Sequence, residues 1–285
     1  MDKVAIVADS IACLTTEMME QYEIRLVAAN ILFDGQVYRE YVDISPSEAY
    51  RLLEKDPERF TTSAPSPTDY LEAYRELSTR TENILCITLS SKLSMLHDAA
   101  AVAAEQAKEE LPQTQIKVLD SGTCAAAEGL VVLAAARAAA EGLGLAGAIR
   151  AAETVRERVT LFALMETIRY AYRSGRIPKV AARVGSAFSI KPIFTVSDGV
   201  AHFVGIARSK ERGVERIIQM AREKIGGNPV HMAVMHADAL DEAERLRERV
   251  ASEFNCVELW VSEFSPIMGY TTGRGLLGFS FYSGT

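Results

Sequence analysis

Three short apolar runs, each followed by a segment with helical spacing, constrain the fold more than any other feature of this sequence. They cover residues 4–8, 84–89 and 116–119. Apolar strands that alternate with helices are typical of a parallel sheet buried on both faces, because the crossover helices cover those faces. Residues 25–33 form a further strand candidate. We therefore predict an α/β region with a parallel sheet in the first half of the chain.

The pattern changes near residue 158. Two Ala-rich helices are predicted before it, over residues 125–141 and 146–157, and a new strand follows it, over residues 159–164. A chain of 285 residues exceeds the usual size of one domain. We expect two domains, residues 1–158 and 159–285, with a single large α/β domain as the alternative.

The second domain is predicted to be a smaller α+β unit. The dipeptide Asp198-Gly199 between two apolar runs indicates a β-hairpin, because this pair favours the tight turns that join antiparallel strands. The rest of the domain is predicted to contain a helix over residues 165–173, a turn at Ser174-Gly175 and a second helix that ends near residue 186. Further helices are predicted over residues 210–224 and 240–253, and strands over residues 231–236, 257–264 and 279–282.

Composition and charge exclude several functional classes. The net charge of −7 disfavours nonspecific binding to nucleic acid. The four cysteines, Cys13, Cys86, Cys124 and Cys256, form no C-x-x-C pair, which disfavours a zinc or thioredoxin-like site. The first apolar run is too short for a signal peptide, and charged residues interrupt the Ala-rich stretch. We expect a cytoplasmic protein without stable membrane insertion.

Familiar catalytic and cofactor motifs are missing from the sequence. The four histidines form no metal-binding pair, so no metal is expected, and His236 at a strand end is the only one considered for a site. No G-x-S-x-G motif occurs. The run from Gly273 to Gly278 matches G-x-G-x-x-G, but it lies too near the C-terminus to open a βαβ unit. No catalytic residue, metal or cofactor is therefore predicted.

Small hydroxyl and acidic residues follow the predicted strands, where ligands bind to open parallel sheets. The pairs Asp9-Ser10 and Asp120-Ser121 each end a strand, and Ser90-Ser91 with Ser94 follows another. Such residues also cap helices and form turns, and for each one alone that interpretation is the simpler. Three such groups at one predicted edge favour a small polar site.

A second group of hydroxyls occupies residues 61–67, including Thr62 and Ser63, which we expect to form the loop before a helix. Free backbone N–H groups at a helix N-terminus can hold an anion there. Most basic residues early in the second domain are expected on solvated helix faces. Arg176, which follows a Ser-Gly turn, and Arg208, at a strand end, are the better candidates for defined roles.

Taken together, these segments resemble the DegV family over essentially the whole chain. The resemblance is carried by their order and spacing: Val7-Ala8-Asp9-Ser10, Thr62-Ser63-Ala64-Pro65-Ser66, Leu89-Ser90-Ser91-Lys92-Leu93-Ser94, Val118-Leu119-Asp120-Ser121, Ser174-Gly175-Arg176-Ile177, Ile190-Lys191-Pro192-Ile193 with Asp198-Gly199, and the glycine-rich C-terminus.

The resemblance implies a DegV-like two-domain fold and one long-chain fatty acid held in a buried apolar tunnel. It implies that Thr62 and Ser94 hold the carboxylate and that Arg176 belongs to the same polar network. Some members present the acid to a separate fatty acid kinase, and a basic residue matching Arg208 helps them dock. On this basis the protein is a carrier without cofactor or catalytic residues. The alternatives are an enzyme that acts on an acyl or phosphorylated small molecule at the Ser/Asp-rich edge, and an interaction protein with a vestigial pocket.

The sequence departs from the family pattern at the expected head-group site. Met95-Leu96 replaces Gly-Thr after Ser94, and we expect these residues either to narrow the tunnel or to pack against the sheet. Near the C-terminus, Thr271 replaces His and Arg274 replaces Pro. We expect both to join the carboxylate site, Arg274 supplying the lost positive charge. The remaining residues expected at the rim are Asp9, Ser10, Ser63, Ser91, Asp120, Ser121 and Gly273.

Overall fold

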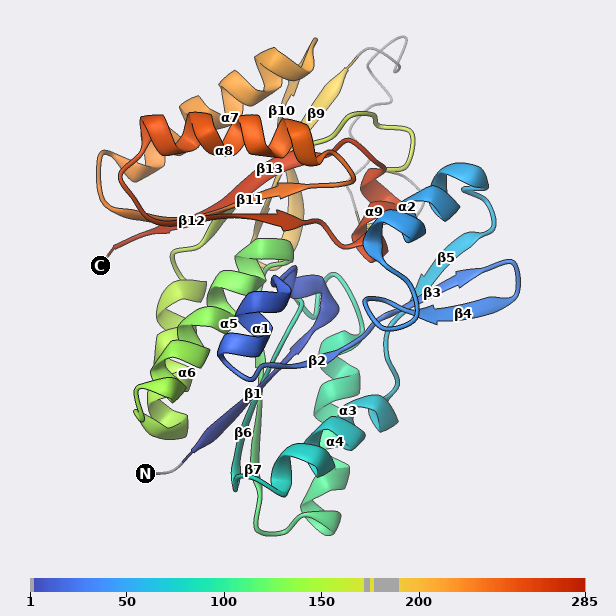
Figure 1. The fold of residues 1–285 in the computed structure, drawn as a ribbon, viewed down its shortest axis with the longest axis vertical. Helices are drawn as coiled ribbons and strands as arrows, with labels where there is room; N and C mark the ends of the chain where they lie inside the picture. Colours follow the sequence, from blue (N-terminus) through green and yellow to red (C-terminus); the bar gives the residue numbers. More distant parts are fainter. Residues whose placement is uncertain (1–2, 172–174, 177–189, 285) are drawn as a thin grey trace.

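The computed structural model describes residues 3–171, 175–176 and 190–284, and it confirms the mixed α/β class. Its strands form three sheets, with the orders β2-β1-β6-β7, β4-β3-β5 and β10-β9-β8-β13-β11-β12. In Figure 1 the first half of the chain lies below, in blue to green, and the second half above, in orange to red. All strands of the third sheet come after residue 159, so the proposed division at residues 158 and 159 coincides with a change of sheet.

The first sheet is parallel throughout, as predicted. It consists of β1 (Val4–Asp9), β2 (Arg25–Val27), β6 (Asn83–Thr88) and β7 (Gln115–Asp120). On one face α3 (Pro67–Ser78) and α4 (Leu96–Glu110) pack against the sheet; on the other lie α5 (Ala125–Ala140), α6 (Gly144–Arg156) and the short α1 (Thr16–Gln21). Burial on both faces explains why these strands are apolar without alternation.

The second sheet differs from the sequence prediction. The strand expected over residues 25–33 is two strands, because the chain leaves the first sheet after β2 and continues as β3 (Asn30–Phe33). It then turns at Asp34-Gly35, both with positive φ, into β4 (Gln36–Arg39), followed by α2 (Pro46–Lys55). The loop expected over residues 61–67 is also wrong in part, because residues 61–63 belong to β5 (Phe60–Ser63), which pairs with β3.

The third sheet contains β8 (Thr160–Leu164), β9 (Lys191–Ser197), β10 (Val200–Ala207), β11 (Val230–His236), β12 (Cys256–Glu263) and β13 (Leu277–Ser283). Its pairs are antiparallel except for β11 with β12. The β9–β10 hairpin is confirmed, with φ of 51° at Asp198 and 77° at Gly199, as a two-residue turn of this kind requires. Helices α7 (Lys210–Ile225) and α8 (Leu240–Glu253) cover one face (Figure 1).

Two further elements were not predicted correctly. Residues 165–171 form turns instead of a helix, because the Met165 N–H donates to Pro192 O (2.9 Å) and keeps the chain beside β9. Residues 172–173, and the second helix expected to end near residue 186, lie outside the described residues. Helix α9 (Pro266–Thr272) was missed, since seven residues are too few to show a helical period.

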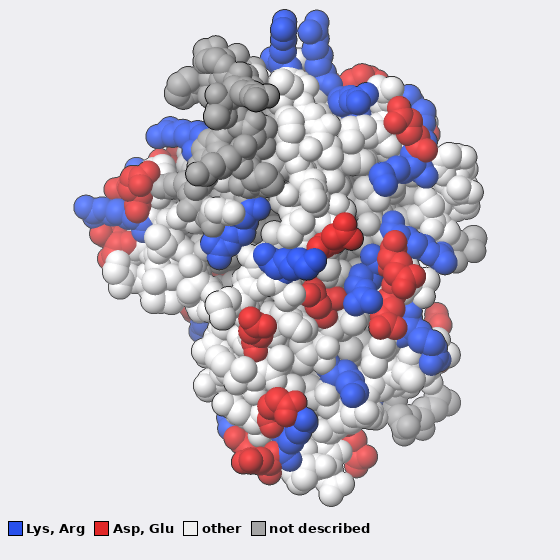
Figure 2. Space-filling view, turned by 180° about the vertical axis from the view of Figure 1, so that it is seen from behind, with Lys and Arg blue, Asp and Glu red and all other residues white. Residues whose placement is uncertain are grey.

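The largest apolar cluster joins the two halves of the chain. It combines residues of the N-terminal half, such as Ile11 and Phe60, with Phe194, Met235 and Phe264 of the C-terminal half. It therefore lies between the carboxyl edge of the parallel sheet and the face of the third sheet that α7 and α8 leave uncovered. On the face of the molecule in Figure 2, basic and acidic side chains are interspersed without a wide patch of one sign.

Candidate functional site

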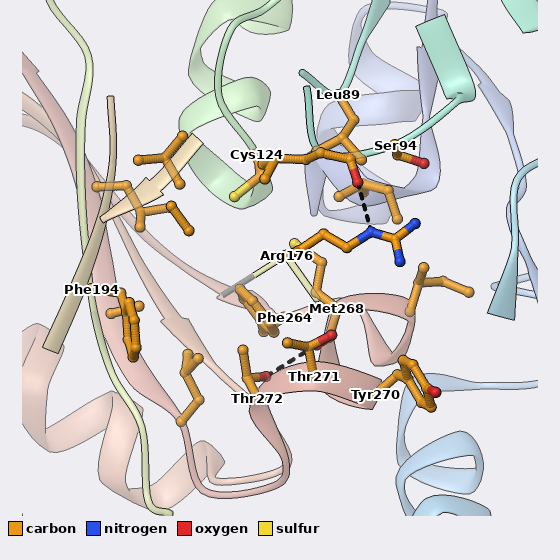
Figure 3. Close-up of a pocket in the computed structure, with 18 of the residues that line it drawn as sticks. Leu89, Ser94, Cys124, Arg176, Phe194, Phe264, Met268, Tyr270, Thr271 and Thr272 are labelled. Atoms are coloured by element: carbon orange, nitrogen blue, oxygen red, sulfur yellow. Dashed lines mark hydrogen bonds between the residues drawn. The ribbon is translucent and has the colours of Figure 1, made fainter. Parts of the chain in front are cut away.

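A cavity of about 330 Å³ lies within this central cluster (Figure 3). Its volume falls in the range of small-molecule sites, roughly 300–1,000 Å³. Most of its wall is apolar: Ile11, Leu89, Leu93, Leu96, Cys124, Leu161, Ala163, Met165, Phe194, Val196, Ala201, Phe264, Ile267, Met268 and Leu276. Both halves of the chain contribute, so the cavity exists only when they are packed together.

The polar groups of the wall are mainly hydroxyls, together with one guanidinium. Thr62, Ser94, Arg176 and Thr271, four of the five residues predicted to bind a carboxylate, all line the cavity. Figure 3 shows Ser94 and Arg176 on one side and Phe194 on the opposite side. We call the side with Ser94 and Arg176 the polar end and the side with Phe194 the apolar end. A charged group on one side of a mainly apolar space suits an amphipathic ligand.

Ser94 does not cap the helix that follows it. Helix α4 begins at Leu96, its N-cap residue is Met95, and that position makes no side-chain cap hydrogen bond. The backbone N–H of Ser94 donates to Ser90 O (3.2 Å) in the turn after β6. The Ser94 hydroxyl has no partner in the described part of the chain, so it is available to a ligand.

Thr62 and Thr271 reach the cavity from opposite halves of the chain. Thr62 is half-buried in β5, opposite Ile31 of β3. Thr271 lies in α9 with 9% of its surface exposed. Within the described ranges neither hydroxyl is hydrogen-bonded, whereas that of the adjacent Thr272 donates to Met268 O (3.3 Å). Thr62 and Thr271 therefore both line the cavity and have hydroxyls available to a ligand.

Arg176 supplies the positive charge at the polar end. Its Nε–H donates to Leu93 O (3.2 Å), the residue next to Ser94 (Figure 3). This bond holds the guanidinium beside the Ser94 hydroxyl. A guanidinium is always charged at physiological pH and presents several N–H donors, so it suits a carboxylate ligand.

Arg274 is not part of this site, contrary to the prediction. It is absent from the cavity wall and forms ion pairs with Glu54 and with Asp238, the latter at 2.6 Å. These contacts place it in a separate charged groove of about 1,170 Å³. The chain reverses at Gly273 and Gly275, both with positive φ, so that Thr271 and Arg274 face different spaces.

The acidic residues at the edge of the parallel sheet act as caps and turn residues. Asp9 is fully buried and accepts from the N–H groups of Ile11 (3.0 Å) and Leu89 (2.8 Å). Burial raises the pKa of Asp9 to about 6 despite these bonds. Asp120 accepts from the Ser91 hydroxyl (2.6 Å). The capping interpretation is therefore correct for both.

The other predicted rim residues also lie outside the cavity wall. The Ser10 hydroxyl accepts from Ala29 N–H (3.1 Å), and the Ser121 hydroxyl accepts from Thr123 N–H (3.3 Å). Ser63 is exposed at the end of β5. The edge residues do come together as predicted, but their polar groups are largely used within the protein.

The two departures from the family pattern after Ser94 have different outcomes. Met95 is 65% exposed and does not reach the cavity, whereas Leu96 is buried and lines it. Only Leu96 can therefore restrict a ligand. Gly273 ends α9 with a φ of 75°, and a Cβ there would lie 2.5 Å from the Tyr170 ring. Its role is to let the chain turn closely against Tyr170.

Helix α9 contributes five wall residues that the sequence interpretation mostly missed: Ile267, Met268, Tyr270, Thr271 and Thr272. One signal was present. Ser265 followed by Pro266 is typical of a helix start, with serine as N-cap and proline in the first turn. His236, the histidine considered for a site, instead accepts from Ala239 N–H (3.2 Å) beside the charged groove.

The described residues contain no group of three or more His, Cys, Asp or Glu side chains arranged to hold a metal. Arg208 is exposed and lies on the charged groove, next to the start of α7.

Comparison with known proteins identifies the family. A family model described as "Uncharacterised protein, DegV family" matches residues 3–284. The chain belongs to the DegV family. A DegV domain-containing protein of Streptomyces coelicolor is 34% identical over 280 residues, covering 96% of each chain.

Solved structures of DegV proteins share the fold. A DegV family protein from Thermus thermophilus, described as binding fatty acid, superposes with a TM-score of 0.89 at 27% identity over 99% of both chains. DegV of Bacillus subtilis, described as a fatty acid binding protein, gives 0.87 at 26% identity over 100% of both. Among the described residues of the present DegV protein, no helix has the length and apolar character needed to cross a bilayer.

Proposed function

We propose that this DegV protein binds one long-chain fatty acid, with the carboxylate at Thr62, Ser94, Arg176 and Thr271. The observation that carries the proposal is the cavity itself, which combines an apolar wall with free hydroxyls and a guanidinium at one end. Relatives described as fatty acid binding proteins, with the same fold over the whole chain, support it.

The apolar wall favours the acyl chain as the main source of affinity. Each buried methylene contributes roughly 0.8 kcal/mol, so ten of them would contribute about 8 kcal/mol before the entropic cost of binding. Side chains such as Phe194, Phe264 and Met268 offer only dispersion contacts along this path. The tail thus provides binding strength and requires little specific chemistry.

The polar end fixes the orientation of the ligand. A carboxylate removed from water needs hydrogen-bond donors, and bonds to an ionised group are about twice as strong as neutral ones. The hydroxyls of Thr62, Ser94 and Thr271 can donate because no protein acceptor in the described structure occupies them. Arg176 adds a charge of the correct sign at a site open to solvent.

We further propose that the protein presents the bound acid to a separate fatty acid kinase, with exposed Arg208 at the docking surface. In this arrangement the protein is a carrier and the chemistry occurs on the partner. Among the described residues, the wall of the cavity holds no pair that resembles a nucleophile with its base.

The direct test is to extract the purified protein with organic solvent and analyse the extract by mass spectrometry. One equivalent of a long-chain fatty acid per chain is expected, and delipidated protein should rebind hexadecanoic acid with 1:1 stoichiometry. Turnover of an acyl ester or acyl phosphate by protein that binds no fatty acid would instead favour the enzyme interpretation.

A further inference from the structure

A buried glutamate lies behind the helix that forms one wall of the cavity. Glu40 follows β4, is fully buried, and its Oε1 accepts a hydrogen bond from the Ser265 hydroxyl at 2.6 Å. Its other oxygen, Oε2, is shielded from solvent and has no hydrogen-bond partner in the described structure. No basic side chain is among the described groups that act on the Glu40 carboxyl, and it forms no ion pair with any of them. A charged carboxylate in such a place would be costly, whereas a neutral acid would not.

Ser265 links this glutamate to α9. Its hydroxyl is the N-cap of the helix, accepting from Ile267 N–H at 3.2 Å while it donates to Glu40. Its backbone N–H donates to the Cys13 sulfur at 3.4 Å. Glu40 and Cys13 belong to the N-terminal half of the chain and Ser265 to the C-terminal half. Residues of the N-terminal half therefore hold the first turn of α9, which belongs to the C-terminal half.

Helix α9 depends on such contacts for its position. It has only seven residues, and isolated helices of this length are unstable in water. Tyr50 adds further contacts from the N-terminal half, because its hydroxyl donates to Phe264 O (2.7 Å) and its ring lies against Gly269. Because the helix carries five residues of the cavity wall, a shift of its first turn would move that wall.

We infer that Glu40, as a neutral carboxylic acid, is a positioning residue that fixes α9 and so keeps the cavity in its binding shape. This inference rests on the proposed function for the identity of the ligand. It adds a requirement for ligand binding that the cavity residues alone do not show: the Glu40 carboxyl behind α9 must be protonated.

The surroundings of Glu40 define the pH range in which this proton is lost. Burial, with a contribution from the neighbouring Asp9 carboxyl, raises the pKa of Glu40 to about 8, and the hydroxyls of Ser10 and Ser265 offset only part of this rise. The other titratable groups that face it from adjoining elements are Cys13, Tyr41 and Tyr50, with Glu128 and Glu263 beyond them.

Cys13, Tyr41, Tyr50 and Asp9 are not expected to titrate in the same range. Burial raises the pKa values of Cys13, Tyr41 and Tyr50 well above their usual ones, and Asp9 titrates lower, near 6. Burial also raises the pKa values of Glu128 and Glu263, so the comparison with Glu40→Gln is what assigns a change in this range to Glu40.

Because the pKa of Glu40 is raised from 4.5 to about 8, the free energy of unfolding falls as pH rises between these two values. Between pH 7 and pH 9 the carboxyl of the folded protein itself ionises. The Ser265 hydroxyl bonds more strongly to a carboxylate, but the buried charge has no counter-ion among the described residues, so it favours a shift of α9 that admits water.

The test compares hexadecanoic acid binding to the wild type and to Glu40→Gln from pH 7 to pH 9. Wild-type affinity is expected to fall about tenfold, the change for one required proton with a pKa near 8, and the Gln variant should show a flat profile. Glu40→Ala, which cannot bond to Ser265, should bind about tenfold or more weakly already at pH 7. Identical pH profiles for wild type and Glu40→Gln would overturn the inference.

A matched pair of serine variants separates positioning from general destabilisation. Ser265→Ala should weaken binding as Glu40→Ala does, whereas Ser262→Ala removes a buried hydroxyl bonded to Cys13 O but leaves the α9 cap intact. Equal losses of affinity in both would contradict the inference. Hydrogen exchange of α9 amides at pH 8.5 should be faster in wild type than in Glu40→Gln. This readout stands even if no fatty acid binds, so failure of the proposed function would be recognised separately.

Discussion

The cavity and the charged groove lie on either side of the short segment that joins α9 to β13, yet their chemistry is opposite. In the cavity, hydroxyls without protein partners and one guanidinium face an apolar space. In the groove, Lys191 pairs with Glu166, Lys210 with Glu242, and Arg274 with Glu54 and Asp238. The difference leads us to propose that the carboxylate binds where hydroxyls lack protein partners beside an apolar space, and not where charged side chains are most numerous.

The largest loss of fatty-acid affinity is expected when a side chain fills the apolar end of the cavity, and this variant is the strongest test of the difference between cavity and groove. Ala201→Trp places a large ring into the wall opposite Val196. Loss of space for about four methylenes should weaken fatty-acid binding by about 3 kcal/mol, or roughly 100-fold. Titration calorimetry measures this. His202→Trp, one residue along β10 with its side chain on the other face, is the control, and equal losses in both would argue against the cavity.

The next effect concerns the free donors at the polar end. Ser94→Ala removes a hydroxyl without a protein partner in the described structure, and affinity should fall by roughly 1.5–3 kcal/mol, the value for a hydrogen bond to a charged group. Ser91→Ala is the matched control, because its hydroxyl is bonded to Asp120 and lies outside the cavity. Unchanged affinity in Ser94→Ala would show that this hydroxyl does not contact the ligand.

Removing the guanidinium should have a smaller effect because Arg176 is exposed. Arg176→Met is expected to reduce affinity by about 1 kcal/mol at low salt, and by less as salt screens the charge. Arg176→Lys keeps the charge and should recover part of the loss. Binding measured at two ionic strengths provides the check. A loss in Arg176→Met that does not depend on salt would point to packing as the role of this side chain.

The smallest effect on binding is expected on the groove side. Arg274→Ala should leave fatty-acid affinity within about twofold of wild type and lower the free energy of unfolding by about 1 kcal/mol or less, because its ion pairs are partly exposed. Glu54→Ala should lower the stability measured by thermal unfolding by a similar amount, because it removes the same ion pair. A clear loss of affinity in Arg274→Ala alone would show that the two spaces communicate.

The sequence predicts local and periodic features well, and the structure explains where it fails. The parallel strands and the Asp198-Gly199 hairpin follow from short-range patterns and are confirmed. The surroundings of Arg274 cannot be inferred in this way, because its partner Glu54 lies 220 positions away in the chain. The role of Glu40 is hidden for the same reason, since Ser265 is 225 positions distant.

At the candidate site, the predicted residues Thr62, Ser94 and Thr271 line the cavity and have hydroxyls without partners in the described structure, whereas the predicted rim residues outside it are mostly hydrogen-bonded within the protein. Sequence shows that Asp9, Ser91 and Ser94 all follow strands, but it does not show which of them finds an internal partner. That outcome depends on the tertiary packing of the loops. Helix α9 was missed because a seven-residue helix gives almost no periodic signal, although the Ser265-Pro266 pair marked its start.

Because the two halves of the chain enclose the cavity jointly, a ligand bound in it contacts both halves at once. A ligand that binds only the assembled form stabilises it by mass action, by about 2.7 kcal/mol at a free concentration 100 times its dissociation constant. Loaded molecules should therefore outlast empty ones under heat or protease. Occupancy of the cavity would then govern how long each copy of the protein survives.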